Sequence, residues 1–143
     1  MALSFSTINC RKSQDAFVEI KEILLKGKPA VIAVQENPKR KGNPFKGSGD
    51  YLVPDTDKGR AAIVVSNSIE ANLIPQLCTP DIAVALAVLL GPEGKKRCIL
   101  IVSYYSDITK PVDSTALESI RRYSDTNGYE ILMGGGMQML SNE

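Results

Sequence analysis

The residues from Ala30 to Glu36 constrain the fold of this chain most, because they form an unbroken apolar run that ends on a carboxylate. Such a run of small and β-branched residues is typical of a strand covered on both faces, so Val31, Ile32 and Val34 are predicted core residues. Glu36 then lies on rigid backbone at the rim of the sheet. There its carboxylate either binds a hard cation such as Mg²⁺ or simply solvates the end of the strand.

The residues before this run predict a strand, a helix and a second strand. Residues 3–10 alternate apolar and polar side chains, as a half-buried strand does. Ser13 is the expected cap of a helix over 14–26, whose apolar residues form one stripe. Because the carboxyl ends of neighbouring parallel strands meet at one edge, we expect Asn9 and Glu36 to lie close together.

The middle and end of the chain predict further strands and a second helix. A long loop over 37–58 with a short strand inside it precedes an antiparallel meander. The strands of this meander are expected at 59–65, 72–77, 82–90 and 97–103. Ser114 or Thr115 is expected to start the second helix, with Glu118 completing a capping box with Thr115, and residues 129–133 are expected to form a last buried strand.

Composition indicates one globular domain and excludes several kinds of chemistry. The 143 residues are 43% hydrophobic, with 17 basic and 16 acidic residues and no histidine. Without histidine, this chain acting alone cannot form a Ser-His-Asp triad, a Cys-His pair or a histidine metal site. Its three separated cysteines argue against a disulfide framework. No apolar run is long enough for a membrane span and no signal peptide is evident, so an intracellular protein is expected.

A group of positive charge lies in the segment after Glu36. Lys39, Arg40, Lys41 and Lys46 cluster there among proline and glycine residues. Such a basic loop either contacts phosphates of a nucleic acid or is only solvated.

Five short motifs carry a resemblance to a known family. They are Ile8–Ser13, Ile32–Pro38, Lys58–Val65, Ile101–Tyr105 and Ile131–Gly135. In this order they resemble the endonuclease/exonuclease/phosphatase superfamily, and best the apurinic-type endonuclease domain of insect non-LTR retrotransposons, the jockey-like elements that also encode a reverse transcriptase. The resemblance implies Mg²⁺-dependent phosphodiester hydrolysis that nicks target DNA, in the nucleus.

The resemblance also assigns roles to individual residues. Asn9 corresponds to the asparagine that helps to hold the catalytic centre, and Glu36 to the metal-binding glutamate. Tyr105 corresponds to the tyrosine that contacts the scissile phosphate, and the alternative is that it only caps a sheet. Arg60 falls within a motif and either pairs with phosphate or is solvated. We expect Asn9, Glu36 and Tyr105 to gather at one rim.

The departures from the family pattern predict a truncated, inactive copy. Gly136 and Gln138 stand where the family has an aspartate that orients the attacking water and an asparagine that supports the phosphate. By the resemblance, a histidine and a further aspartate come from a second half of the domain. Residues 1–143 are therefore expected to be a truncated domain of the α+β class, a partial sandwich of about one sheet layer with two flanking helices.

A single layer would leave one sheet face uncovered, with consequences for partners. Val31, Ile63 and Val65 would then be exposed, so the chain is expected to be unstable alone or to pair with a second polypeptide. Two functions follow from the sequence. The chain is either an inactive fragment of a retrotransposon endonuclease domain, or a non-catalytic DNA- or protein-binding module derived from one.

Overall fold

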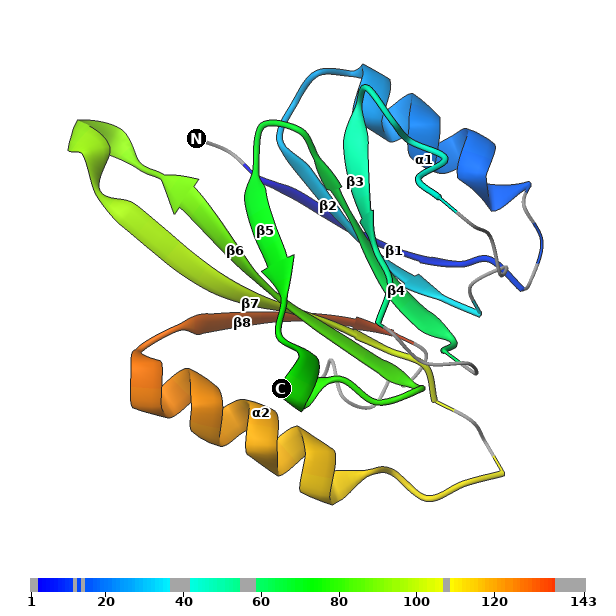
Figure 1. The fold of residues 1–143 in the computed structure, drawn as a ribbon, viewed down its shortest axis with the longest axis vertical. Coiled ribbons are helices and arrows are strands. Elements are labelled where there is room, and N and C mark those ends of the chain that lie inside the picture. Colours follow the sequence, from blue (N-terminus) through cyan, green and yellow to red (C-terminus); the bar gives the residue numbers. More distant parts are fainter. Residues whose placement is uncertain are drawn as a thin grey trace.

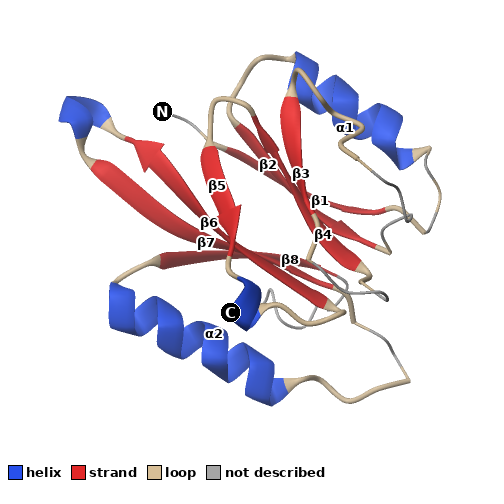
Figure 2. Cartoon of the chain, in the orientation of Figure 1, coloured by secondary structure: helices blue, strands red, loops and turns tan. Residues whose placement is uncertain are grey.

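The fold consists of two β-sheets packed face to face, with one helix on the outer side of each (Figure 1). It is known from a computed structural model that describes residues 3–11, 13, 15–36, 42–54, 59–106 and 109–135. Figure 2 shows the strands meeting in the middle and the two helices lying outside them. The predicted α+β class with two flanking helices is confirmed. Neither helix in these ranges is long and apolar enough to cross a membrane.

The first sheet has the strand order β1-β2-β4-β3. Its strands are β1 (Ser4–Asn9), β2 (Ala30–Gln35), β3 (Gly49–Leu52) and β4 (Ala61–Ser66). Helix α1 (Ala16–Leu25) joins β1 to β2, which therefore run parallel, whereas β4 is antiparallel to both of its neighbours. The predicted strand, helix and strand at the start of the chain are confirmed, with the ends of α1 shifted inward.

The second sheet has the strand order β5-β6-β7-β8. Its strands are β5 (Glu70–Leu73), β6 (Ile82–Leu90), β7 (Lys96–Tyr104) and β8 (Glu130–Gly135). Strands β5, β6 and β7 form an antiparallel meander, with the short 3₁₀ helices η1 (Pro75–Leu77) and η2 (Pro92–Gly94) in its connections. Helix α2 (Ser114–Asn127) then leads to β8, which is parallel to β7.

The expectation of about one sheet layer is wrong, because the chain supplies both layers. Val31, Ile63 and Val65 are fully buried rather than exposed, and they pack in one core with Ala85 and Ile101 of the second sheet. The predicted meander divides after β4, where the short link to β5 carries the chain from one sheet to the other. The inner sheet faces therefore cover each other, which removes the reason for expecting a second polypeptide there.

Each outer sheet face is covered by its own helix, and the two helices differ from expectation at their ends. Phe17, Ile20 and Leu24 of α1 are buried against the first sheet, and Ile120 of α2 is buried against the second. Ser13 does not cap α1. Its hydroxyl accepts a hydrogen bond from the backbone N–H of Asp15 at 3.1 Å, and so orders the turn before the helix.

Strand β8 is less buried than the sequence predicted. Its Ile131 and Met133 side chains are each 36% exposed, because β8 is the edge strand of the second sheet. Only Leu132 of this hydrophobic run packs against the core between the sheets. The interpretation of this segment as a buried strand is therefore wrong for its outer face.

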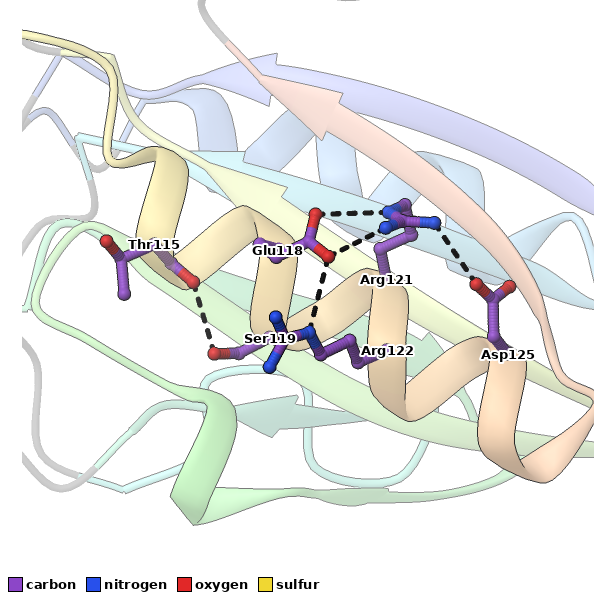
Figure 3. Close-up of polar contacts among 6 residues, drawn as sticks. All are labelled: Thr115, Glu118, Ser119, Arg121, Arg122 and Asp125. Atoms are coloured by element: carbon purple, nitrogen blue, oxygen red, sulfur yellow. Dashed lines mark hydrogen bonds and ion pairs between the residues drawn. The ribbon is translucent and has the colours of Figure 1, made fainter.

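Helix α2 is capped by the residue before the two predicted candidates. The Asp113 carboxylate accepts a hydrogen bond from the backbone N–H of Ala116 at 3.0 Å. Glu118 does not form the expected capping box and instead pairs with Arg121 and Arg122, as Figure 3 shows. The hydrogen bond from Arg121 is the main cause that lowers the pKa of the Glu118 carboxyl. These charges lie on the exposed face of the helix, where ion pairs add little stability.

Replacing Asp113 by alanine is expected to lower the free energy of unfolding by about 1 kcal/mol, because the N–H of Ala116 loses its acceptor. Thr115→Ala is the matched control, since Thr115 lies inside the helix and its side chain is exposed. Urea unfolding of both variants measures the difference. A larger loss for Thr115→Ala than for Asp113→Ala would restore the capping assignment made from sequence.

Candidate functional site

The carboxyl end of β1 is shaped by the side chain of Asn9. Its Oδ1 accepts a hydrogen bond from the backbone N–H of Arg11 at 2.8 Å, which closes a tight turn directly after the strand. Arg11 has a φ of 51°, a left-handed conformation that is uncommon for a residue with a Cβ atom. Between them, the N–H of Cys10 donates to the carbonyl of Gln35 at 2.9 Å and extends the pairing of β1 with β2.

Glu36 follows β2 at the same edge of the first sheet. Asn9 pairs with Gln35 in the last rung of the parallel ladder, so Glu36 lies one residue beyond it. Glu36 is half-buried and has a φ of 48°, so its backbone is also left-handed. Non-glycine residues held in this region cost free energy and occur often at functional sites. Two such residues therefore follow two neighbouring strands at one rim.

Tyr105 reaches this rim from the second sheet. The Ser103 hydroxyl of β7 donates to the Val34 carbonyl of β2 at 2.8 Å, across the sandwich. The carboxyl ends of β2 and β7 therefore lie against each other, and Tyr105 directly follows β7. The structure thus places Asn9, Glu36 and Tyr105 at the same end of the sandwich.

A buried polar network joins the strands beneath this rim. The Gln35 Nε2 donates to the Ser103 Oγ at 3.1 Å, and the Gln35 Oε1 accepts from the Thr7 hydroxyl at 3.1 Å. Gln35 and Ser103 are both buried. The sequence pattern alone indicates no role for these two side chains. The available signal was Gln35 itself, because it lies at the end of a strand predicted to be covered on both faces. A buried amide requires hydrogen-bond partners.

Arg60 is held by contacts within the chain. Its Nε donates to the Asp81 Oδ1 at 2.7 Å, and its Nη2 donates to the Asp81 Oδ2 at 3.0 Å. Its guanidinium carbon also lies 4.6 Å from the centre of the Tyr105 ring, at the distance of a cation–π contact. Arg60 therefore is not simply solvated. Asp81 lies in a loop, and nothing in the sequence around it indicates this pairing.

Other predicted residues lie outside the part of the chain that the structure describes. These are Lys39, Arg40, Lys41, Gly136 and Gln138.

The described residues offer few ligands for a metal ion. They include no group of three or more histidine, cysteine, aspartate or glutamate side chains that could hold one. At the rim Glu36 supplies one carboxylate, while both carboxylate oxygens of Asp81 accept hydrogen bonds from Arg60. Cys10 is no substitute, because burial raises the pKa of its thiol to about 11. Among the described residues, a single carboxylate such as that of Glu36 fits a cation that keeps several waters and takes further oxygens from a phosphate, as Mg²⁺ does.

The arrangement of two packed sheets, an outer helix on each and polar residues at one rim is similar to that of two solved structures. The endonuclease domain of TRAS1, a telomere-specific non-LTR retrotransposon, matches 90% of this chain with a TM-score of 0.65 and 25% identity. TDP2 from D. rerio, in a complex with a single-stranded DNA product, matches 93% with a TM-score of 0.53 and 15% identity, which shows the fold alone.

These similarities extend over only part of the other proteins. The chain spans 56% of the TRAS1 domain structure and 59% of the TDP2 structure. No protein-family model matches the sequence, and no curated protein matches it significantly. The similarity to the TRAS1 domain confirms the resemblance to the endonuclease/exonuclease/phosphatase superfamily and its retrotransposon endonucleases that the sequence motifs indicated.

Proposed function

We propose that this chain is part of an endonuclease domain of the non-LTR retrotransposon type and binds DNA at the rim that contains Asn9, Glu36 and Tyr105. The observation that carries the proposal is the similarity to the TRAS1 endonuclease domain over 90% of the chain. Three residues of those motifs, Asn9, Glu36 and Tyr105, follow or end strands at one end of the sandwich. By this resemblance the chain acts in the nucleus, within a polyprotein that also carries a reverse transcriptase.

The rim residues have distinct proposed roles toward a phosphate of the DNA backbone. The Tyr105 phenol donates a hydrogen bond to a phosphate oxygen, and Arg60 keeps positive charge beside that ring. Glu36 holds Mg²⁺, which when bound neutralises charge on the phosphate. Lys39, Arg40 and Lys41 are proposed to contact the DNA backbone, because they begin three residues after Glu36 in sequence.

We also propose that this chain does not hydrolyse DNA by itself. Gly136 provides no group that could orient a water molecule, and the sequence contains no histidine. The loss of one positioned acid–base group lowers a rate by about 10²- to 10⁴-fold. Catalytic groups that act together lose most of their effect when one is absent. The absence of both the aspartate and the histidine should therefore abolish turnover.

Purified protein incubated with supercoiled plasmid and Mg²⁺ is expected to produce no nicked circles above background. Glu36→Ala is the matched control, because it removes the only carboxylate proposed to hold the metal and keeps the rest of the rim. Nicking by the wild-type protein that Glu36→Ala abolishes would show that the chain is an active nuclease.

A double variant tests whether two residues explain the proposed inactivity. Gly136→Asp combined with Gln138→Asn restores the family pattern at both positions and is expected to bind Mg²⁺ more tightly, because it adds an oxygen ligand. It should still leave the plasmid intact, since histidine remains absent. The assays are Mg²⁺ titration and plasmid nicking. Cleavage by this variant would show that the histidine is not required.

A further inference from the structure

Two arginines are placed at the candidate rim, and they differ in their contacts. Arg60 precedes β4 and lies beside the last rung that joins Gln35 to Ala61. Its guanidinium is already engaged by Asp81 and by the Tyr105 ring. A phosphate that approached Arg60 would compete with a two-pronged ion pair whose partners are only 27% and 22% exposed. Arg60 is therefore better suited to holding Tyr105 and Asp81 in place than to binding a ligand.

Arg11 lies on the other side of Glu36, after the neighbouring strand β1. It is exposed, and within the described residues its guanidinium makes no hydrogen bond or ion pair. Of the two arginines, Arg11 is thus the one that can bind a phosphate without breaking a hydrogen bond or ion pair to the protein. A planar guanidinium presents a fork of N–H groups that matches the oxygens of a phosphate.

The backbone of Arg11 is fixed although its side chain is exposed. Its left-handed φ of 51° is stabilised by the hydrogen bond from its N–H to the Asn9 Oδ1. The next residue but one, Ser13, donates its N–H to the Cys10 carbonyl at 2.9 Å, and Cys10 itself is buried. The turn that carries Arg11 is therefore anchored to the sheet, which reduces the ordering cost of binding through this residue.

We propose that Arg11 binds a backbone phosphate of DNA beside Glu36, and that Asn9 is a positioning residue that acts by holding the turn of Arg11. This inference rests on the proposed function, because it names a phosphate contact within the same DNA-binding rim. It differs from the sequence analysis, which considered Arg60 for phosphate and gave Arg11 no role. Asn9 on this account need not touch the DNA.

The test is fluorescence anisotropy with a short fluorescein-labelled DNA duplex at several salt concentrations. Arg11→Gln removes one charge and the fork of donors, and is expected to raise Kd about tenfold at low salt, as the loss of a charge-assisted hydrogen bond does. The slope of log K against log salt should become shallower by about 0.9, because one fewer phosphate is neutralised. Arg11→Lys should keep the slope and lose part of the affinity.

Two further variants separate a specific contact from a general effect. Lys28→Gln removes the same charge from an exposed residue at the opposite end of the first sheet, before β2, and should leave Kd within about twofold. Asn9→Ala should weaken binding in the wild-type background but not in Arg11→Gln, because it acts through Arg11. Circular dichroism of each variant verifies that the fold is retained.

The outcomes distinguish this inference from the proposed function. Unchanged Kd and salt slope in Arg11→Gln, with wild-type protein that binds the duplex, would overturn the role of Arg11 and leave the DNA-binding rim intact. Equal losses in Arg11→Gln and Lys28→Gln would also overturn it, since they would show only an effect of net charge. Absence of binding by the wild-type protein at low salt would overturn both.

Discussion

Replacing Ile63 by alanine is expected to lower the free energy of unfolding by about 2–5 kcal/mol, the range observed when a large aliphatic side chain is truncated in a core. Ile63 is fully buried on the inner face of β4, and it packs with Ala85 and Ile101 of the facing sheet. Its truncation removes apolar contacts on both sides and leaves a cavity between two sheets that cannot easily close. Urea unfolding followed by circular dichroism measures the loss.

Leu25→Ala is the matched control for this prediction. Leu25 ends α1 and is 75% exposed, so its truncation should change stability by less than about 0.5 kcal/mol. The comparison also decides between the two architectures. In a chain with a single sheet layer, Ile63 would face solvent, and both substitutions would have similarly small effects. Equal effects would therefore contradict the sandwich.

The positions of Asn9 and Glu36 could be predicted from sequence because the information is local. A strand, a helix and a strand within the first 35 residues allow essentially one arrangement, with parallel neighbours whose carboxyl ends share an edge. The hydrophobic pattern of each element appears within a few residues. The same reasoning located β6, β7 and α2, since each has a regular apolar period and a recognisable turn.

The facing of the two sheets could not be predicted in the same way. The segment from β4 to β6 reads as a series of strands with short connections, and this pattern is the same whether the chain continues one sheet or begins another. Periodicity reports which faces are buried but not what covers them. The family comparison then suggested that the covering layer was missing, whereas β5 to β8 supply it.

The contacts that assemble the rim were also beyond sequence reasoning. Arg60 and Asp81 meet because β4 and the loop before β6 lie on different sheets that share one end of the sandwich. Ser103 reaches Val34 and Gln35 across the same interface. Nothing local distinguishes these serine and aspartate side chains from others in the chain, because their partners are set by packing of the sheets.

Ser103→Ala is expected to lower the free energy of unfolding by about 2–3 kcal/mol, much more than a serine hydroxyl contributes on a surface. Ser103 is fully buried, and its Oγ accepts from Gln35 and donates to the Val34 carbonyl. Alanine removes both interactions and leaves a buried amide donor without its acceptor. Ser119→Ala is the control, since that hydroxyl is exposed on α2 and bonds only within its helix.

A second substitution at Gln35 should recover part of that loss. Gln35→Met has a similar length and no amide, so in the Ser103→Ala background it removes the donor that alanine left unsatisfied. The losses in free energy of unfolding of the single variants Ser103→Ala and Gln35→Met should therefore sum to more than the loss of the double variant. The difference, which is the coupling energy of the two residues, is expected to be about 1–2 kcal/mol. Additive losses would mean that the hydrogen bond from Gln35 to Ser103 does not join the sheets. The rim would then depend on apolar packing and on its other polar contacts, such as the Arg60–Asp81 ion pair, to keep Glu36 and Tyr105 at the same end of the sandwich.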